Sequence, residues 1–271
     1  PQYDSIEFLP AIIQQLLHPI DKLYTHQYQA ISSILHGENV MVTTSTSSGK
    51  SLIYQISTLL QLIRSTKSCI IYISPTKALA QDQKRSFQNF ISKLHQLPNI
   101  QQDPIFNQYL KHLEVATYDG DTPVEERRRV RLNHNIRVIF TNPDMLHTSI
   151  LPNHLLWKRV LSHLKIVILD ELHIYNGLFG THVSFVMRRL NRLLKYYAAS
   201  NKFIGCSATL KNPYNAFVEL TGCSNVTIID KDGSPRGLKN VVVWNPDPVT
   251  TTSSMKYKRD FIGESANIIV Q

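Results

Sequence analysis

Gly49, Lys50 and Ser51 stand between an apolar stretch and a helical pattern, as a phosphate-binding loop would. A strand that turns tightly into a helix directs backbone N–H groups and the positive helix end at phosphates. The lysine would add charge beside the β- and γ-phosphates, and the serine hydroxyl can bind Mg²⁺. Thr44 occupies the position of the first glycine in G-x-x-x-x-G-K-[ST], so the match is incomplete. Four small residues that let the backbone approach a phosphate lie between: Ser45, Thr46, Ser47 and Ser48.

Asp170 and Glu171 end a second apolar stretch. A carboxylate at the carboxyl edge of a parallel sheet is placed to hold Mg²⁺ directly or through water, and the next carboxylate can polarise an attacking water. We therefore predict that Asp170 binds the metal and that Glu171 is the candidate base. A single acidic strand end is commonly just a solvated charge, but a phosphate loop on another strand of the same sheet argues against that alternative.

Both candidate sites need strands to position them. Short apolar runs rich in β-branched residues alternate with helical patterns along the chain. This alternation is typical of βαβ units and of a parallel sheet covered by helices on both faces. The sequence therefore predicts a doubly wound, mostly parallel α/β domain. Its strands are expected near residues 40–44, 69–74, 114–118, 137–141, 165–170 and 203–207.

Two basic helices are predicted beside this sheet. Thr122 as N-cap, Pro123 at the first position and Glu125 three residues after the cap form a capping box. The tail of this helix, residues 127–131, places cations where the helix dipole favours them, and nucleic-acid contact is an equal alternative. The second basic helix, residues 185–197, has apolar spacing on one face, which favours a solvated outer face for its cations.

The pattern changes near the end of the chain. Residues 211–222 predict a short helix closed by Gly222, residues 225–230 predict a strand, and residues 231–237 form a turn-rich connection. A further strand is expected in 238–247, followed by a polar stretch and a final amphipathic segment. We expect the chain to leave one domain here and to enter another that it does not complete.

Composition limits the class of protein. The 271 residues, with 42% hydrophobic content, can bury a core in one large or two smaller domains. No apolar run approaches the roughly 18 residues of a membrane helix, and residues 1–10 are not a signal peptide. Three cysteines without a C-x-x-C pair predict buried thiols and no zinc site. The net charge of +9 favours an anionic partner such as nucleic acid, although charge alone is weak evidence. Because the chain begins at Pro1, we expect a fragment or a processed form.

Several motifs occur in an order that resembles a superfamily 2 helicase of DExH type. Motifs I, II and III correspond to "SSGKS" at 47–51, "DELH" at 170–173 and "SAT" at 207–209. Motif Ia, motif Ib and the upstream glutamine motif correspond to "SPTKALAQDQ" at 74–83, "TNPDMLH" at 141–147 and "YTHQYQAI" at 24–31.

Longer stretches resemble a RecQ-related family of fungal and bacterial DNA helicases with a C-terminal cysteine-rich domain, relatives of the human RecQ helicase mutated in Rothmund–Thomson syndrome. They are "TSTSSGKSLIYQ", "PTKALAQDQKR", "YDGDTP", "TNPDMLHTSILP" and "DELHIYNGLFGTHV". The resemblance covers about residues 23–245, and it assigns Thr44 to this family's version of the loop. It implies a RecA-like P-loop NTPase fold with three parts: a lead-in (1–22), the first RecA-like lobe (23–222), and a connection with the incomplete start of a second RecA-like lobe (223–271).

The resemblance implies roles at a site for ATP and Mg²⁺. Gln27 would read the adenine edge, Asp170 would hold Mg²⁺ with Ser51, and Glu171 would act on the water. His173 would link motif II to motif III or to the second lobe. The phosphates would be bound by Thr46, Ser47, Ser48, Gly49, Lys50 and Ser51. Nucleotide state would be coupled to lobe movement by Ser207, Ala208 and Thr209.

The resemblance also implies that a DNA backbone crosses the top of the sheet. Short polar side chains and backbone amides suit phosphate contacts, which position a strand without reading its sequence. The alternative is that Thr76 and Lys77 cap the helix after Pro75, and that Asp144 caps the helix after Pro143. The candidates for the strand-facing surface are Thr76, Lys77, Gly120, Thr141 and Asp144.

The implied function is an ATP-dependent DNA helicase that moves 3′→5′ on single-stranded DNA and unwinds duplex DNA, in DNA repair and in the nucleus. An arginine from a second lobe is worth about 10³–10⁵ in rate, so this lobe alone is expected to bind Mg-ATP but to hydrolyse it poorly. An RNA helicase, a duplex translocase and a nucleotide-binding scaffold without turnover stay open. A P-loop kinase or transferase accounts less well for "SAT" and for the two strand-facing loops.

Overall fold

The computed structural model describes residues 1–235, 237, 249–250, 256–257 and 265. The chain divides into two units, Pro1–Ser234 and Pro235–Gln271. The described part of the second unit includes a short antiparallel pair, β10 (Val249–Thr250) and β11 (Lys256–Tyr257). The strand expected in 238–247 lies outside the described residues, as does nearly all of the final amphipathic segment.

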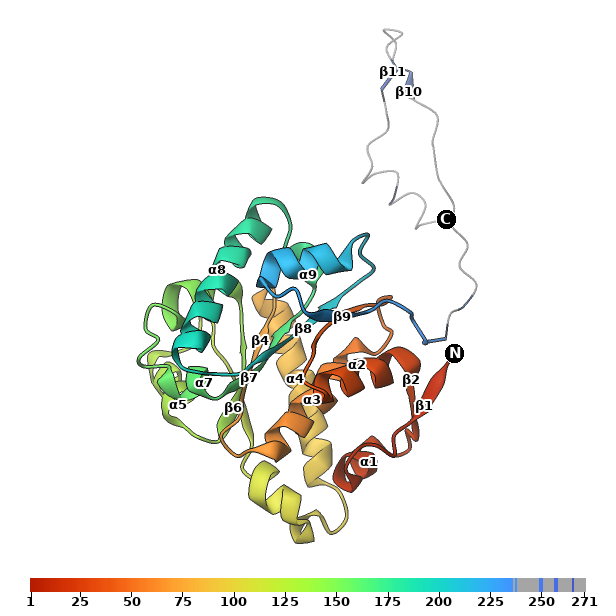
Figure 1. The fold of residues 1–271 in the computed structure, drawn as a ribbon, viewed down its shortest axis with the longest axis vertical. Coiled ribbons are helices and arrows are strands. Elements are labelled where there is room, and N and C mark those ends of the chain that lie inside the picture. Colours follow the sequence, from red (N-terminus) through yellow and green to blue (C-terminus); the bar gives the residue numbers. More distant parts are fainter. Residues whose placement is uncertain (236, 238–248, 251–255, 258–264, 266–271) are drawn as a thin grey trace. The chain divides into compact units, whose positions relative to one another are not determined.

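The first unit is built on a seven-stranded sheet in which every strand pair is parallel (Figure 1). The strand order is β5-β6-β4-β7-β8-β3-β9. The predicted α/β fold is therefore confirmed, and the observed strands begin and end within one residue of the predicted ones. Their bounds are β3 (Asn39–Thr43), β4 (Cys69–Ile73), β5 (Glu114–Thr117), β6 (Ile136–Thr141), β7 (Leu164–Leu169), β8 (Lys202–Ser207) and β9 (Val226–Ile229).

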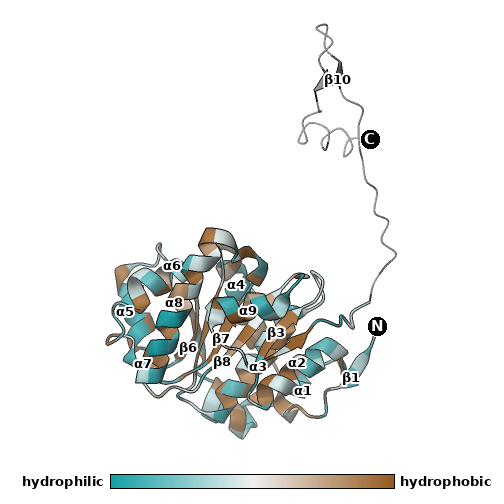
Figure 2. Cartoon of the chain, turned by 45° about the horizontal axis from the view of Figure 1, so that its top comes forward, coloured by the Kyte–Doolittle hydropathy of each residue, from teal (hydrophilic) through white to brown (hydrophobic). Residues whose placement is uncertain are grey.

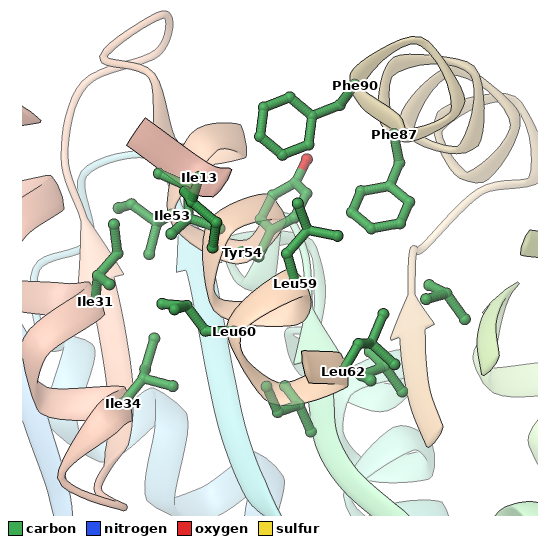
Figure 3. Packing of buried hydrophobic residues seen from close by; sticks show 14 of the residues in the cluster. Ile13, Ile31, Ile34, Ile53, Tyr54, Leu59, Leu60, Leu62, Phe87 and Phe90 are labelled. Atoms are coloured by element: carbon green, nitrogen blue, oxygen red, sulfur yellow. The ribbon is translucent and has the colours of Figure 1, made fainter. Parts of the chain in front are cut away.

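Helices cover both faces of this sheet, because alternate strand residues are apolar on both sides. One core contains apolar side chains of α1 (Ala11–Leu17), α2 (Thr25–Leu35), α3 (Lys50–Arg64) and α4 (Lys77–His95). Figure 3 shows α3 in this core: Ile53 and Leu60 lie toward Ile31, and Leu59 lies toward Phe87.

The opposite core contains apolar side chains of the remaining long helices, and Figure 2 shows mostly hydrophobic colour on the central strands with polar colour on the outer helix faces. No helix in the described part of the chain is long and apolar enough to cross a membrane. The other helical segments are α5 (Val124–Leu132), α6 (Pro143–Met145), α7 (Lys158–Ser162), α8 (Gly177–Tyr196), α9 (Pro213–Thr221), the 3₁₀ turns η1 (Ile100–Gln102) and η4 (Leu172–Ile174), and the π-helical turns η2 (Phe106–Leu110) and η3 (Leu146–Ile150).

The first and last parts of this unit belong to the same fold as its centre. β1 (Tyr3–Ser5) pairs with β2 (Lys22–Tyr24), and the apolar face of α1 is buried in the core. β9 pairs with β3, so the sheet continues past the boundary expected after Gly222. The functional division into lead-in, motor lobe and start of a second lobe stays a prediction.

The start of α5 differs from the predicted capping box. The helix begins at Val124 with Pro123 as N-cap, and no side chain caps it. The Thr122 hydroxyl accepts a hydrogen bond from the Asp119 amide at 2.9 Å, so it is engaged in the preceding turn. A local turn thus competes with the cap for the same hydroxyl. In the second basic helix, α8, the predicted apolar face is confirmed, since Val186, Met187, Leu190 and Leu194 are buried.

Candidate nucleotide site and nucleic-acid face

The loop between β3 and α3 adopts a conformation that few residues tolerate. Gly49 has φ 80°, and Ser47 has φ 63° although it carries a side chain. A Cβ on Gly49 would lie 2.5 Å from Nε2 of Gln27, so the loop needs glycine there for both conformation and space. Strained backbone of this kind persists only where its surroundings hold it.

Gln27 is one of the residues that hold the loop. Its Nε2 donates to the Gly49 carbonyl at 3.0 Å, and its Oε1 accepts from the Tyr24 amide at 3.0 Å. Both ends of the buried amide are thus used by backbone groups. The structure places Gln27 against the phosphate loop, and its predicted contact with adenine stays a prediction.

Thr44, which replaces the first glycine of the common motif, contributes a contact of its own. Its hydroxyl lies 2.7 Å from that of Ser48, and both residues are buried. Lys50 Nζ donates to the carbonyls of Thr44 at 3.0 Å and Ser45 at 2.7 Å. An ammonium has three donors, so one is left for a phosphate. The Thr44 side chain therefore stabilises the loop through its contact with Ser48.

His26 and Asp232 also contact the loop, and neither was among the predicted site residues. His26 Nε2 lies 3.0 Å from the Ser48 carbonyl, and its Nδ1 accepts from the Gly233 amide at 3.2 Å. Burial lowers the pKa of His26, which favours the neutral ring that these two bonds require. Asp232 Oδ2 accepts from the amide of Ser45 at 3.1 Å and also from its hydroxyl.

Asp170 directly follows β7 and is buried, with 8% of the residue exposed. Its Oδ2 accepts a hydrogen bond from the Tyr72 hydroxyl, and its Oδ1 accepts from the Glu171 amide at 3.0 Å. Burial raises the pKa of Asp170, and the bond from Tyr72 offsets part of that effect. β8 pairs with β7 on one side and with β3 on the other, so the acidic strand end and the phosphate loop lie at the same edge of the sheet.

Motifs II and III are in direct contact. Glu171 has φ 49°, and its Oε2 lies 3.3 Å from His173 Nδ1. The same Nδ1 lies 3.1 Å from the Ser207 hydroxyl, which accepts from the His173 amide at 3.2 Å. Beside them, the Thr43 hydroxyl donates to the Ala208 carbonyl at 3.2 Å. These bonds connect the strands of the phosphate loop, motif II and motif III, while Thr209 is exposed.

The residues at this site fit Mg-ATP. Lys50 supplies a cation that uses two of its three donors on loop carbonyls, and the hydroxyl of Ser51 with the carboxylate of Asp170 are ligands that Mg²⁺ prefers. Mg²⁺ would neutralise charge on the β- and γ-phosphates. Loop amides and Lys50 would orient the phosphates, and the Glu171 carboxylate would accept a proton from water.

The predicted strand-facing residues lie at the carboxyl ends of the neighbouring strands. Lys77 Nζ forms an ion pair with Asp121 at 2.7 Å, and both side chains are exposed, at 49% and 78%. This pair joins the loop after β4 to the loop that contains Gly120 after β5. Thr76 accepts a hydrogen bond from the Leu79 amide at 3.3 Å, so it is the N-cap of α4. The capping alternative is therefore correct for Thr76, and Lys77 is the first helical residue.

The two candidates after β6 differ from each other. Thr141 is buried, and its hydroxyl donates to the Tyr118 carbonyl at 2.7 Å, so this side chain does not reach the surface where a strand was expected. Asp144 is exposed. The cap of α6 is Asn142, whose Oδ1 accepts from the Met145 amide at 2.9 Å, so the alternative that Asp144 caps this helix is wrong.

The arginines of α5 have structural partners. Arg127 donates to the carbonyls of Thr122 and Gly120 at 2.8 and 2.9 Å. Arg129 pairs with Glu126 and Glu114. These contacts favour a structural role for Arg127 and Arg129 over contact with nucleic acid. Arg128, in contrast, is exposed.

The strand order separates two sets of residues along one edge of the sheet. Strands β7, β8 and β3 are neighbours, and the predicted nucleotide residues follow them. Strands β5, β6 and β4 are also neighbours, and the predicted strand-facing residues follow them. We call these the nucleotide half and the track half of the edge.

Some residues that shape the nucleotide half carry a local sequence signal and others do not. His26 is adjacent to Gln27 in the glutamine motif, and Tyr72 places a hydroxyl in an otherwise apolar strand. Asp232 contacts Ser45 across 187 positions of sequence, so no local pattern identifies it.

A RecA-like lobe with a phosphate loop and an acidic strand end in one site defines a P-loop nucleotide-hydrolysing motor. Residues 24–217 match the model of the DEAD/DEAH box helicase family, and the chain belongs to this family. It is 51% identical to the ATP-dependent helicase HRQ1 of Saccharomyces cerevisiae over 98% of the chain and 23% of that protein. It is 39% identical to the uncharacterized ATP-dependent helicase YprA of Bacillus subtilis over 84% of the chain and 28% of that protein. The chain thus spans about a quarter of the length of these relatives.

Solved structures show the same fold. The DUF1998 helicase MrfA bound to DNA and AMPPNP superimposes with a TM-score of 0.83 at 34% identity, over 99% of this chain and 35% of that one. The helicase Lhr of Mycobacterium smegmatis bound to single-stranded DNA and AMP-PNP gives a TM-score of 0.74 at 24% identity, over 98% of this chain and 33% of that one.

Proposed function

We propose that this lobe powers an ATP-dependent DNA helicase. It binds Mg-ATP at the nucleotide half and provides one side of a single-strand track at the track half. With a second RecA-like lobe in the intact protein, it moves 3′→5′ on single-stranded DNA and unwinds duplex DNA. The observation that carries this proposal is the division of one sheet edge into the two halves.

The relatives support the choice of DNA. MrfA was solved with DNA and AMPPNP, and the similarity covers 99% of this chain and 35% of that one. Similarity to HRQ1, together with the motifs shared with RecQ-related helicases, supports the finer family assignment. We extend the proposal to DNA repair in the nucleus on that resemblance alone.

The contacts between motifs give the proposal a coupling route. A change at Glu171 when the γ-phosphate is lost would reach Ser207 through His173, since the ring contacts both side chains. Ser207 is fully buried, so a shift of its position requires movement of the strand end. Backbone of motif III is bonded to Thr43 beside the phosphate loop, so a movement of that loop would act on the same segment as a change at Glu171.

The test is ATP hydrolysis by the intact protein with single-stranded DNA, single-stranded RNA or duplex DNA. We expect the largest stimulation by single-stranded DNA, and Lys50→Ala should abolish it. Stronger stimulation by RNA would support an RNA helicase, and stronger stimulation by duplex would support a duplex translocase. If the protein binds Mg-ATP but hydrolyses it with none of these nucleic acids, the result supports a nucleotide-binding scaffold without turnover.

A further inference from the structure

Three segments that are distant in sequence meet at the phosphate loop. The exit segment, Asp232–Ser234, follows β9 where the chain leaves the sheet. Figure 1 shows the N-terminus beside this point, and the Gln2 amide donates to the Gly233 carbonyl at 3.0 Å. The third segment contains Thr25 and His26, and the Thr25 amide donates to the Gln2 carbonyl at 3.0 Å.

The exit segment holds the loop through a chain of hydrogen bonds. Asp232 uses one carboxylate oxygen for Ser45, as described above, and the other for the amide and hydroxyl of Ser234 at 2.9 and 2.6 Å. Its side chain is only 1% exposed. Burial raises the pKa of Asp232, but the bonds from Ser234 and Ser45 outweigh this and hold it below its usual range. The carboxylate is therefore ionised at neutral pH, as acceptance of four bonds requires.

Gly233 makes the junction possible. A Cβ at this position would lie 3.1 Å from the Thr25 amide and 3.2 Å from the Gln2 carbonyl, and closer still to the Thr25 hydroxyl. The backbone of the exit segment thus approaches Thr25 and Gln2 so closely that a side chain at position 233 would force these neighbours to shift. From there, the Gly233 amide reaches His26, whose other nitrogen contacts the Ser48 carbonyl.

We propose that Asp232 and Gly233 are positioning residues of the phosphate loop. They fix Ser45 and, through His26, Ser48, the two residues that flank the strained segment at Ser47, in the conformation that nucleotide binding uses. Coupling between two sites is reciprocal, so nucleotide binding also orders the exit segment. The inference rests on the proposed function only where it concerns ATP, because the loop contacts exist without nucleotide.

The first test measures hydrogen exchange of the amides of residues 45–48 in the intact protein without nucleotide. Asp232→Asn and Gly233→Ala should speed this exchange, and each has a matched control. Asp230→Asn removes the same charge from an exposed position two residues earlier, and Gly237→Ala adds a Cβ where nothing lies within 4 Å. Exchange in β4, whose paired strands are β6 and β7, reports whether the fold is intact.

The second test measures Mg-ATP affinity and the hydrolysis rate at saturation. We expect Asp232→Asn and Gly233→Ala to weaken binding about tenfold, the scale of a hydrogen bond to a charged group. The saturating rate should change less, because neither residue touches the reacting atoms. Unchanged exchange at 45–48 in both variants, or equal changes in the controls, would overturn the proposal. If the parent protein binds no Mg-ATP, the proposed function fails, and the exchange result still decides whether the exit segment holds the loop.

Discussion

The nucleotide half and the track half of one sheet edge are built differently. In the nucleotide half, Asp170, Ser207 and Thr44 are buried, and the side-chain oxygen of each is hydrogen-bonded within the site. In the track half, Lys77 and Asp121 pair on the surface, and Asp144 is exposed. The fold holds the polar side chains of the nucleotide half in place, whereas the charged side chains of the track half are exposed to solvent. Substitutions in the first should change nucleotide binding, and those in the second should change only the response to nucleic acid.

Lys50→Ala should have the largest effect. Removing the ammonium leaves the β- and γ-phosphates without their charge partner. We expect ATP hydrolysis stimulated by single-stranded DNA to fall at least about 10²-fold, the scale of a lost transition-state donor. Steady-state hydrolysis by the intact protein measures this. Lys93→Ala, an exposed lysine in the last turn of α4, is the control and should retain the parent rate. Retention of hydrolysis by Lys50→Ala would remove the loop from the mechanism.

Asp170 gives the next largest effect and a pH signature. Burial raises its pKa, so Mg²⁺, which needs the carboxylate, should bind more tightly as pH rises through that pKa. The stability effect has the opposite sign. A raised folded-state pKa means that the protonated form stabilises the fold at low pH, and this contribution is lost as pH rises through the folded pKa. Asp170→Asn should therefore lose Mg-dependent nucleotide binding at every pH, while its thermal midpoint without nucleotide stays equal or rises at neutral pH.

A lower midpoint of Asp170→Asn at neutral pH would contradict this reading. It would mean that ionised Asp170 stabilises the fold through Tyr72 and the Glu171 amide more than burial destabilises it. Tyr72→Phe separates the stabilising hydrogen bond from the destabilising burial of Asp170, because it removes the hydroxyl and keeps the ring.

The two halves also differ in how far sequence could predict them. The strands follow from short β-branched runs, and β3 and β7 end next to the residues that carry local motifs, so the strand ends of the nucleotide half were predicted to within one residue. Side-chain direction was not predictable in the track half. Thr141 lies within a motif, yet its hydroxyl donates to the carbonyl of Tyr118, which directly follows the paired strand β5, so the partner is set by strand pairing. Asp232 depends on the whole chain being folded, since β9 must pair with β3 before it reaches Ser45.

Lys77→Ala should have a moderate effect confined to the track half. A phosphate contact contributes affinity in a salt-dependent way, so we expect affinity for single-stranded DNA to fall about fivefold, with the salt slope reduced by about 1. Affinity for Mg-ATP without nucleic acid should not change. Asp121→Ala frees Lys77 from its ion pair and should strengthen DNA binding or leave it unchanged. Equal loss of nucleotide affinity in Lys77→Ala would show that the two halves are not separable.

Thr76 should show the smallest effect, and it tests whether a capping residue also faces the strand. Loss of the N-cap in Thr76→Ala removes about 1 kcal/mol, which should speed amide exchange in the first turn of α4 about fivefold. Thr76→Asp keeps an N-cap acceptor and adds a negative charge. If a phosphate backbone passes this position, Thr76→Asp restores slow exchange but weakens binding of single-stranded DNA by repulsion. If it restores exchange and binds DNA as the parent does, Thr76 only caps α4, and the track runs nearer to Lys77 and Gly120.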